Sequence, residues 1–185
     1  MEPAKVAVFL DRDGVLNEPI ILNGKPYPPR DLNELIITRG AGAALEELKR
    51  QGFLLIVVTN QPDIARGKVN RADVDQINAR LAAILPLDAF EVCEHDDKEQ
   101  CDCRKPKPGM ILRAREKFGV DLAGSFMVGD RWRDIEAGRR AGCRTILIGS
   151  GYGETFPFAP TVTHTSLPGA VSWIIRQSQV PAGIR

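Results

Sequence analysis

Two aspartates directly follow an apolar segment in the stretch FLDRDGVLNE, residues 9–18. A single residue separates Asp11 from Asp13, so their carboxylates repel each other unless a cation lies between them. Acidic side chains follow an apolar run again in VGDRWRD, at Asp130 and Asp134. Each aspartate alone is typical of a cap or a turn, but together they offer the oxygen ligands that Mg²⁺ prefers. The pattern therefore predicts a magnesium site.

A second group of candidate ligands lies in the segment CEHDDKEQCDC. It contains Cys93, His95, Cys101 and Cys103, which together offer the sulfur and nitrogen ligands of a tetrahedral zinc site. In a cytosolic chain such clustering favours metal binding over disulfides. The remaining cysteine, Cys143, opens the apolar run CRTILI and is expected to be a buried thiol.

The elements that must position these residues follow from the apolar pattern. Continuous apolar runs, typical of strands buried on both faces, alternate with segments of helical periodicity. The expected strands span 6–10, 53–59, 89–94, 125–129 and 144–149, and the expected helices span 41–50, 71–85, 109–118 and 132–141. This alternation predicts an α/β fold with a Rossmann-like parallel sheet flanked by helices.

Two further segments complete the expected architecture. SLPGAVSWIIRQ has the pattern of a closing helix with Ser166 as its N-cap. The stretch 17–39 is rich in proline and glycine and is expected to form a flap or loop after the first strand.

Polar residues collect where the predicted strands end. In open α/β sheets, ligands bind beyond the carboxyl ends of the strands. A basic segment such as RKPKPG is, on its own, typical of a solvated turn. Here it is one of several groups expected to face the same crevice: Asp11 and Asp13, Thr59 and Asn60, Arg104 and Lys105, and Asp130 and Asp134.

Composition limits the classes of protein to consider. A chain of 185 residues with 26% charged and 43% hydrophobic residues suits a single globular domain, 1–185. Its formal net charge of +1 argues against a nucleic-acid partner. The first residues lack a secretion signal and no run reaches membrane-spanning length, so we expect a cytoplasmic protein with no membrane partner. A monomer is the default expectation.

The segments DRDGV, TNQ, KP and GDRWRD, in this order at strand ends, resemble the four motifs of the haloacid dehalogenase superfamily of phosphohydrolases. The resemblance implies that Asp11 attacks phosphorus and that Asp13 acts as general acid and base. It implies a magnesium site made by Asp11, Asp130 and the backbone carbonyl of Asp13. Thr59 and Lys105 would hold the phosphoryl oxygens.

The spacing between these motifs leaves no room for a large cap domain. We therefore expect a capless fold of the haloacid dehalogenase type, with an open site. Its selectivity would depend on short loops, of which the flap at 17–29 and the zinc loop at 93–103 are available.

One subgroup of the superfamily is the best match. Cys-x-His followed by Cys-x-Cys-Arg-Lys-Pro resembles the D-glycero-D-manno-heptose-1,7-bisphosphate 7-phosphatases, with the histidinol-phosphate phosphatases as close relatives. The resemblance implies that Arg104 and Arg131 contact the substrate, and that Asn60 and Gln61 belong to its phosphate-side loop. In that loop, TNQPDIARG has Pro-Asp where the subgroup commonly has Ser-Gly, and the segment PIILNGKPYPP also departs from the subgroup.

We therefore predict a Mg²⁺-dependent phosphatase with structural Zn²⁺ that acts on a small phosphorylated sugar. The predicted reaction removes the 7-phosphate of a heptose 1,7-bisphosphate, and histidinol phosphate is the alternative substrate. A zinc-stabilised binding module without activity is the alternative from another class. It is disfavoured because the full catalytic set is present: Asp11, Asp13, Thr59, Lys105 and Asp130.

Overall fold

The computed structural model describes residues 5–178. The strands are β1 (Ala7–Leu10), β2 (Ile20–Leu22), β3 (Lys25–Tyr27), β4 (Leu54–Asn60), β5 (Ala89–Cys93), β6 (Phe126–Gly129), β7 (Arg144–Ile148) and β8 (Val162–His164). The helices are α1 (Ala41–Arg50), α2 (Arg71–Ile84), α3 (Gly109–Phe118), α4 (Trp132–Ala141) and α5 (Leu167–Ser178), with short 3₁₀ turns η1 (Asp97–Glu99) and η2 (Gly151–Gly153).

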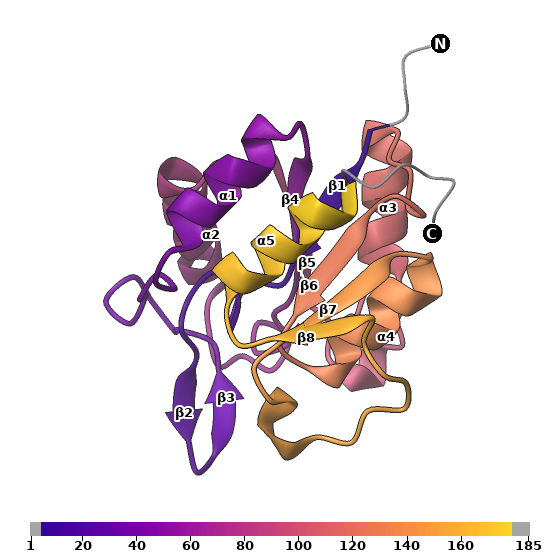
Figure 1. Ribbon diagram of the computed structural model, residues 1–185. Helices are drawn as coiled ribbons and strands as arrows, with labels where there is room; N and C mark the ends of the chain where they lie inside the picture. The colour runs from indigo at the N-terminus through magenta and orange to yellow at the C-terminus, as the bar shows by residue number, and fades with distance from the viewer. Residues whose placement is uncertain (1–4, 179–185) are drawn as a thin grey trace.

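The main sheet is parallel, with strand order β5-β4-β1-β6-β7-β8 and helices on both faces (Figure 1). Alternate residues of β1 serve two cores, because successive side chains of a strand point to opposite faces. Val8 and Leu10 pack into the core with α1, α2 and α5, whereas Ala7 and Phe9 pack into the core with α3 and α4. Strand β1 is therefore buried on both faces in the middle of the sheet, and Asp11 is the residue that follows its end.

Helix α4 approaches the sheet closely. Gly138 permits this approach, since a Cβ atom there would lie 2.5 Å from the Cβ of Met127 on β6. The helix ends at Gly142, which has the left-handed conformation (φ 89°) common at helix C-termini. This packing brings the first turn of α4, with Asp134, against the carboxyl end of β6.

The stretch expected to be a loop contains the antiparallel hairpin of β2 and β3. Its turn is Asn23-Gly24, with φ values of 51° and 73°. The Asn-Gly pair is a strong hairpin signal, so this hairpin was predictable from the sequence. At its base, the chain leaves and returns side by side. Glu18 N donates to Ile36 O (2.8 Å) and Thr38 N donates to Leu16 O (3.0 Å). We call this pairing of 16–18 with 36–38 the neck.

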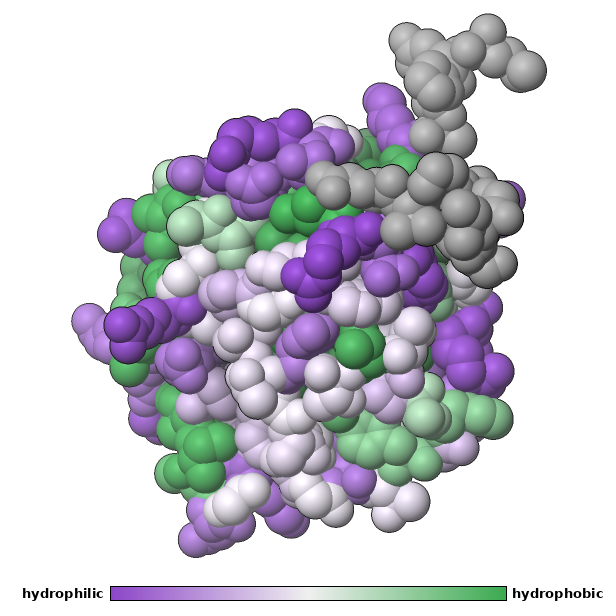
Figure 2. Space-filling view, viewed as in Figure 1, coloured by the Kyte–Doolittle hydropathy of each residue, from purple (hydrophilic) through white to green (hydrophobic). Residues whose placement is uncertain are grey.

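The hairpin projects from the lower left of the molecule (Figure 1). Its exposed side chains include Ile21 and Leu22, which are 52% and 54% accessible. In the matching view, a hydrophobic area lies at this end of the surface (Figure 2). The hairpin is thus held at its neck and not by burial of its tip.

The predicted α/β fold is confirmed, and the expected strands and helices agree with the structure to within one residue at their ends. Ser166 precedes α5 as predicted, and its Oγ accepts a hydrogen bond from Gly169 N (3.4 Å). The expectation of burial on both faces is wrong for β5, which lies at the sheet edge and is mostly half-buried. The short β8 was not predicted, because three residues carry no clear periodicity.

Two expectations concern the whole chain: its domain bounds and the absence of a membrane-spanning segment. The predicted domain 1–185 includes residues 1–4 and 179–185, which lie outside the described residues. Within 5–178, no helix combines the length and the apolar character needed to cross a membrane.

Candidate active site

A cavity of about 380 Å³ opens at the carboxyl ends of β1, β4 and β6. Helix α4 and the loop after the cysteine cluster border it as well. Thr59 and Gln61 are buried (0% and 2% exposed) and are not part of its lining. The lining brings together most of the predicted site residues and two residues of the hairpin: Asp11, Asp13, Asn60, Arg104, Lys105, Asp130, Arg131 and Asp134, with Pro26 and Tyr27.

Asp11 lies at the base of this cavity. Its Oδ1 accepts hydrogen bonds from the backbone N of Arg12 (2.8 Å) and pairs with Lys105 Nζ (2.9 Å). Burial, together with the nearby charge of Asp134, raises the pKa of Asp11 from 3.8 to about 7. Without a further cation, the site therefore disfavours the ionised carboxylate that nucleophilic attack requires.

Asp130 is 3% exposed, and burial followed by the charge of Asp11 raises its pKa well above the usual value. Its Oδ2 accepts a hydrogen bond from Tyr152 Oη (2.8 Å), whereas its buried Oδ1 has no hydrogen-bond partner among residues 5–178. Gly14 (φ 89°) faces this carboxylate so closely that an added Cβ would overlap Asp130 Oδ2. One oxygen is thus held in place and the other is left available.

Asp11, Asp130 and Asp134 form a compact acidic group, because one carboxylate oxygen from each lies within 4.8 Å of the others. Three buried carboxylates at this separation are costly unless positive charge offsets them. Lys105 supplies one charge. The unpartnered Asp130 Oδ1 and the all-oxygen donor set fit a divalent cation such as Mg²⁺.

Lys105 is 2% exposed, and its Nζ contacts Val58 O (2.8 Å), Asp11 Oδ1 (2.9 Å) and Asp134 Oδ1 (2.6 Å). An ammonium has three N–H donors, so all of them have partners. Burial lowers the pKa of Lys105, but Asp11 and then Asp134 more than offset this and raise it overall. Asn60 fixes the backbone of Lys105 from both sides, with Lys105 N to Asn60 Oδ1 at 3.0 Å and Asn60 Nδ2 to Lys105 O at 3.1 Å.

The Asp13 side chain has a different set of partners from this acidic group. Gln61 Nε2 donates to Asp13 Oδ2 (2.8 Å) and also to Thr59 Oγ1 (2.9 Å). Arg12 and Asn17 donate to Asp13 as well. Thr59 and Gln61, at the carboxyl end of β4, are therefore connected to Asp13 by hydrogen bonds.

Arg104 and Arg131 lie further out along the cavity. Arg104 Nε donates to Asp97 Oδ1 (2.8 Å), and Arg131 pairs with Glu154, with Nε to Oε1 at 3.0 Å. Arg104 Nη1 is buried and has no hydrogen-bond partner in the part of the chain that the structure describes. Both guanidinium groups are thus held by carboxylates at the rim, and Arg104 retains an unused donor.

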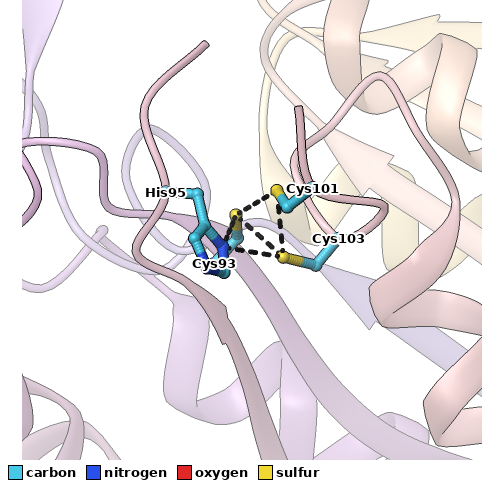
Figure 3. Close-up of side chains that lie close together, drawn as sticks. All are labelled: Cys93, His95, Cys101 and Cys103. Atoms are coloured by element: carbon cyan, nitrogen blue, oxygen red, sulfur yellow. Dashed lines mark hydrogen bonds between the residues drawn. The ribbon is translucent and has the colours of Figure 1, made fainter. Parts of the chain in front are cut away.

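The predicted zinc ligands converge on one point (Figure 3). The separations from Cys103 Sγ are 3.1 Å to Cys93 Sγ, 3.3 Å to Cys101 Sγ and 3.3 Å to His95 Nδ1. Cys93 Sγ is 3.7 Å from both Cys101 Sγ and His95 Nδ1. Ligands around a tetrahedral zinc ion are separated by about 3.5 to 3.8 Å. The contacts of Cys93 with Cys101 and His95 lie in this range and those of Cys103 are shorter, so the four donors are arranged compactly around one point and suit zinc in kind and number.

Four residues that contact the predicted site residues were not predicted from the sequence: Arg12, Gly14, Asn17 and Tyr152. Asn78, which contacts Arg12, was not predicted either. Arg12 and Gly14 stand inside the DRDGV motif, so their position was a usable signal. Tyr152 gave none, because η2 comes from a part of the chain with no motif.

Comparisons with known proteins place this geometry in context. Residues 102–167 match the family model described as HAD-hydrolase-like. The chain is 38% identical to the D-glycero-beta-D-manno-heptose-1,7-bisphosphate 7-phosphatase of Pseudomonas aeruginosa, over 79% of this chain and 82% of that protein. It is 33% identical to the protein of the same name from Escherichia coli K12, over 97% of this chain and 93% of the relative.

Solved structures give a consistent result. A D,D-heptose 1,7-bisphosphate phosphatase from B. bronchiseptica, in complex with magnesium and phosphate, is 30% identical with a TM-score of 0.79, over 94% of this chain and 99% of that one. A HAD-like phosphatase from Mesorhizobium loti is 28% identical with a TM-score of 0.76, over 97% of this chain and 90% of that one.

Proposed function

The chain belongs to the haloacid dehalogenase-like phosphatases and, among them, to the heptose bisphosphate 7-phosphatase family, and from this premise we propose its substrate and the roles of its residues. The predicted family and the prediction of a phosphatase are confirmed. We propose that the protein hydrolyses the 7-phosphate of D-glycero-β-D-manno-heptose 1,7-bisphosphate. The meeting of Asp11, Lys105 and Asp130 in one cavity carries the proposed phosphoryl transfer, and the similarity to the named heptose bisphosphate phosphatases supports the proposed substrate.

Asp11 is proposed as the nucleophile. Its carboxylate attacks phosphorus, the bond to the sugar oxygen breaks, and an aspartyl-phosphate forms on Asp11. Asp13 donates a proton to the departing sugar oxygen. Water then attacks the same phosphorus, Asp13 takes its proton, and phosphate leaves as the Asp11 carboxylate is restored.

Mg²⁺ is the proposed metal, held by Asp11 and Asp130, with the backbone carbonyl of Asp13 as a further ligand. When bound, it would offset the repulsion between the nucleophile and a dianionic phosphate. Lys105 adds a fixed positive charge beside Asp11. Because all three Lys105 N–H donors already have partners, the side chain would act mainly through its charge. Thr59 is buried outside the cavity lining, so its hydroxyl would hold Gln61 and not contact the phosphoryl oxygens directly.

Zn²⁺ is the proposed occupant of the cysteine cluster. Four protein ligands would close its coordination, so the ion would be structural. Cys103 directly precedes Arg104 and Lys105 in the chain. Tethering it would fix the start of the loop that carries Lys105 into the site.

Further proposals concern substrate recognition and the domain number, oligomeric state, location and partners of the protein. Arg104, Arg131 and Asn60 line the cavity and would recognise the substrate around the reacting phosphate. Gln61 lies outside the lining and would act through Asp13. We propose one domain without a cap, acting as a cytoplasmic monomer with no nucleic-acid or membrane partner. An inactive binding module would have no use for the buried acidic group.

Phosphate release tests the proposed reaction. The purified chain with Mg²⁺ is assayed with the β and α anomers of the heptose bisphosphate and with histidinol phosphate. We expect the largest kcat/KM for the β anomer. We expect Asp11→Asn to abolish release from every ester while leaving the fold intact by circular dichroism. A larger kcat/KM for histidinol phosphate would overturn the substrate, and turnover by Asp11→Asn would overturn the mechanism.

A further inference from the structure

We propose that Arg12 is a positioning residue for Asp13, holding its carboxylate ready for proton exchange with the leaving sugar oxygen and with the attacking water. The proposal rests on the phosphatase function above. It adds a residue that lies outside the cavity lining and therefore acts through Asp13 and not on the substrate.

Arg12 is 0% exposed. Its Nε donates to Asp13 Oδ1 and its Nη2 donates to Asp13 Oδ2, each at 3.1 Å. Its Nη1 donates to Asn78 Oδ1 on α2 at 3.0 Å. A buried charge is costly unless it is paired, so this guanidinium is fixed to the carboxylate and anchored from behind by the helix.

The two-point contact fixes the plane of the carboxylate, which a single donor would not do. Asn17 Nδ2 adds a bond to Asp13 Oδ1 (3.1 Å), and Gln61 Nε2 adds one to Oδ2 (2.8 Å). A carboxylate has about four acceptor sites, so these donors together occupy its capacity. Asp13 can therefore exchange a proton only after one donor withdraws.

Gln61 is the donor best placed to withdraw. Its Nε2 also donates to Thr59 Oγ1 (2.9 Å), so it keeps a partner after releasing Asp13. The Arg12 contact, in contrast, is anchored by Asn78, which is itself only 8% exposed. We infer that the leaving oxygen takes the place of Gln61 on Asp13 Oδ2 while Arg12 keeps the carboxylate aligned.

The test compares two leaving groups. A sugar alkoxide needs a proton as it departs, whereas p-nitrophenolate leaves without one. Because kcat/KM reports the steps up to departure of the leaving group, a misplaced Asp13 should affect only the sugar ester. We expect Arg12→Met to lower kcat/KM for the heptose bisphosphate by about 10²-fold or more, with less than a fivefold change for p-nitrophenyl phosphate.

A second readout comes from hydrolysis of the aspartyl-phosphate, the step in which Asp13 takes a proton from water whichever ester was the substrate. Hydrolysis of the aspartyl-phosphate should become slow, so Arg12→Met should release a rapid burst of p-nitrophenol followed by slow turnover. Asn78→Ala, which removes the anchor and leaves the ion pair, should give the same pattern to a smaller degree. The matched control is Arg80→Met on the exposed side of α2, which should change neither ester.

The outcomes separate this proposal from the proposed function. A parent protein that hydrolyses neither ester contradicts the phosphatase function itself. An active parent with equal losses on both esters in Arg12→Met, and no burst, overturns the role of Arg12 alone. If Arg12→Met does not fold, Asn78→Ala decides, and equal losses on the two esters there likewise overturn the proposal.

Discussion

Gly14 shows how a single missing side chain can serve a metal site. Its φ of 89° favours glycine, and any Cβ at this position would overlap Asp130 Oδ2. The carboxylate of Asp130 can therefore reach its position against the backbone of the DRDGV turn. The glycine is required for space as much as for backbone conformation.

We predict that Gly14→Ala weakens Mg²⁺ binding by roughly 10- to 100-fold, because the added methyl displaces Asp130. Isothermal titration with Mg²⁺ measures the effect. Gly119→Ala is the control, since Gly119 also has positive φ (67°) but no atom of the described residues beyond its chain neighbours lies within 4 Å of its added Cβ. Equal Mg²⁺ affinity in the two variants would contradict the prediction.

The residue types and their positions in the motifs predicted that the carboxylates of Asp11, Asp130 and Asp134 lie together, but not which donors contact each of them. Asp13 and Asp11 look equivalent in the sequence, yet Asp11 contacts Lys105 and Asp13 contacts Arg12. Arg12 escaped prediction because arginine is mostly exposed in folded proteins, and its burial depends on Asn78, 66 positions along the chain.

Among the elements, the cysteine cluster connects the edge strand β5 to the loop carrying Lys105. Cys93 ends β5, and Lys107 Nζ donates to Cys101 O (2.8 Å) within the same loop. A metal ion would replace several weak contacts with one strong anchor. The loop would otherwise have to order itself at the expense of its own conformational entropy.

We predict that the parent protein carries about one zinc ion per chain and that Cys101→Ser loses it. The variant should melt roughly 5 °C lower and turn over more slowly, because the Lys105 loop is no longer anchored. Elemental analysis, thermal melting and phosphate release measure these effects. Cys143→Ser is the control: it removes a buried thiol outside the cluster and should retain zinc. A fully active parent without zinc would refute the structural role.

The hairpin of β2 and β3 supplies Pro26 and Tyr27 to the cavity, whereas the exposed Ile21 and Leu22 do not line it. Replacing Ile20–Tyr27 by two glycines should raise KM for the heptose bisphosphate about tenfold, a loss of ~1.4 kcal/mol in binding. KM for p-nitrophenyl phosphate should be unchanged. The double substitution of Ile21 and Leu22 by serine is the control. An unchanged KM in the shortened variant would show that the hairpin takes no part in recognition.

At the scale of the whole molecule, the acidic site links metal binding to pH and to stability. Asp11 has a pKa of about 7 in the folded protein, against 3.8 ordinarily. Between these values the folded state keeps a proton that the unfolded chain has released. The contribution of Asp11 to stability therefore decreases as pH rises through this window when no metal is bound.

We predict that Mg²⁺ raises the melting temperature more at pH 8 than at pH 6. Below about pH 7 a proton competes with the metal for Asp11, and affinity should fall by up to about tenfold per pH unit. Thermal melting with and without Mg²⁺ measures the difference. In Asp11→Asn the pH dependence should become weaker, and the remainder should come from Asp130, whose pKa is also raised by burial. An unchanged pH dependence in this variant would show that Asp11 is not its source.

Over the whole chain, the α/β fold was predictable because long apolar runs and helical periods alternate clearly. The features that the sequence did not predict are local ones. β8 has three residues of mixed exposure, and its pairing with β7 comes from tertiary contacts that no short window of sequence contains. Among the site residues, those in motifs could be named in advance, whereas Tyr152 depends on how η2 folds back toward Asp130.

The neck has a consequence for how this enzyme family can diversify. Because residues 16–18 pair with 36–38, the ends of the inserted segment stay together whatever lies between them. Insertions, deletions or exchange of the hairpin would leave β1, which precedes the proposed nucleophile Asp11, undisturbed. We therefore expect that hairpins grafted from relatives at the neck would change the substrate range without changing the chemistry at the sheet.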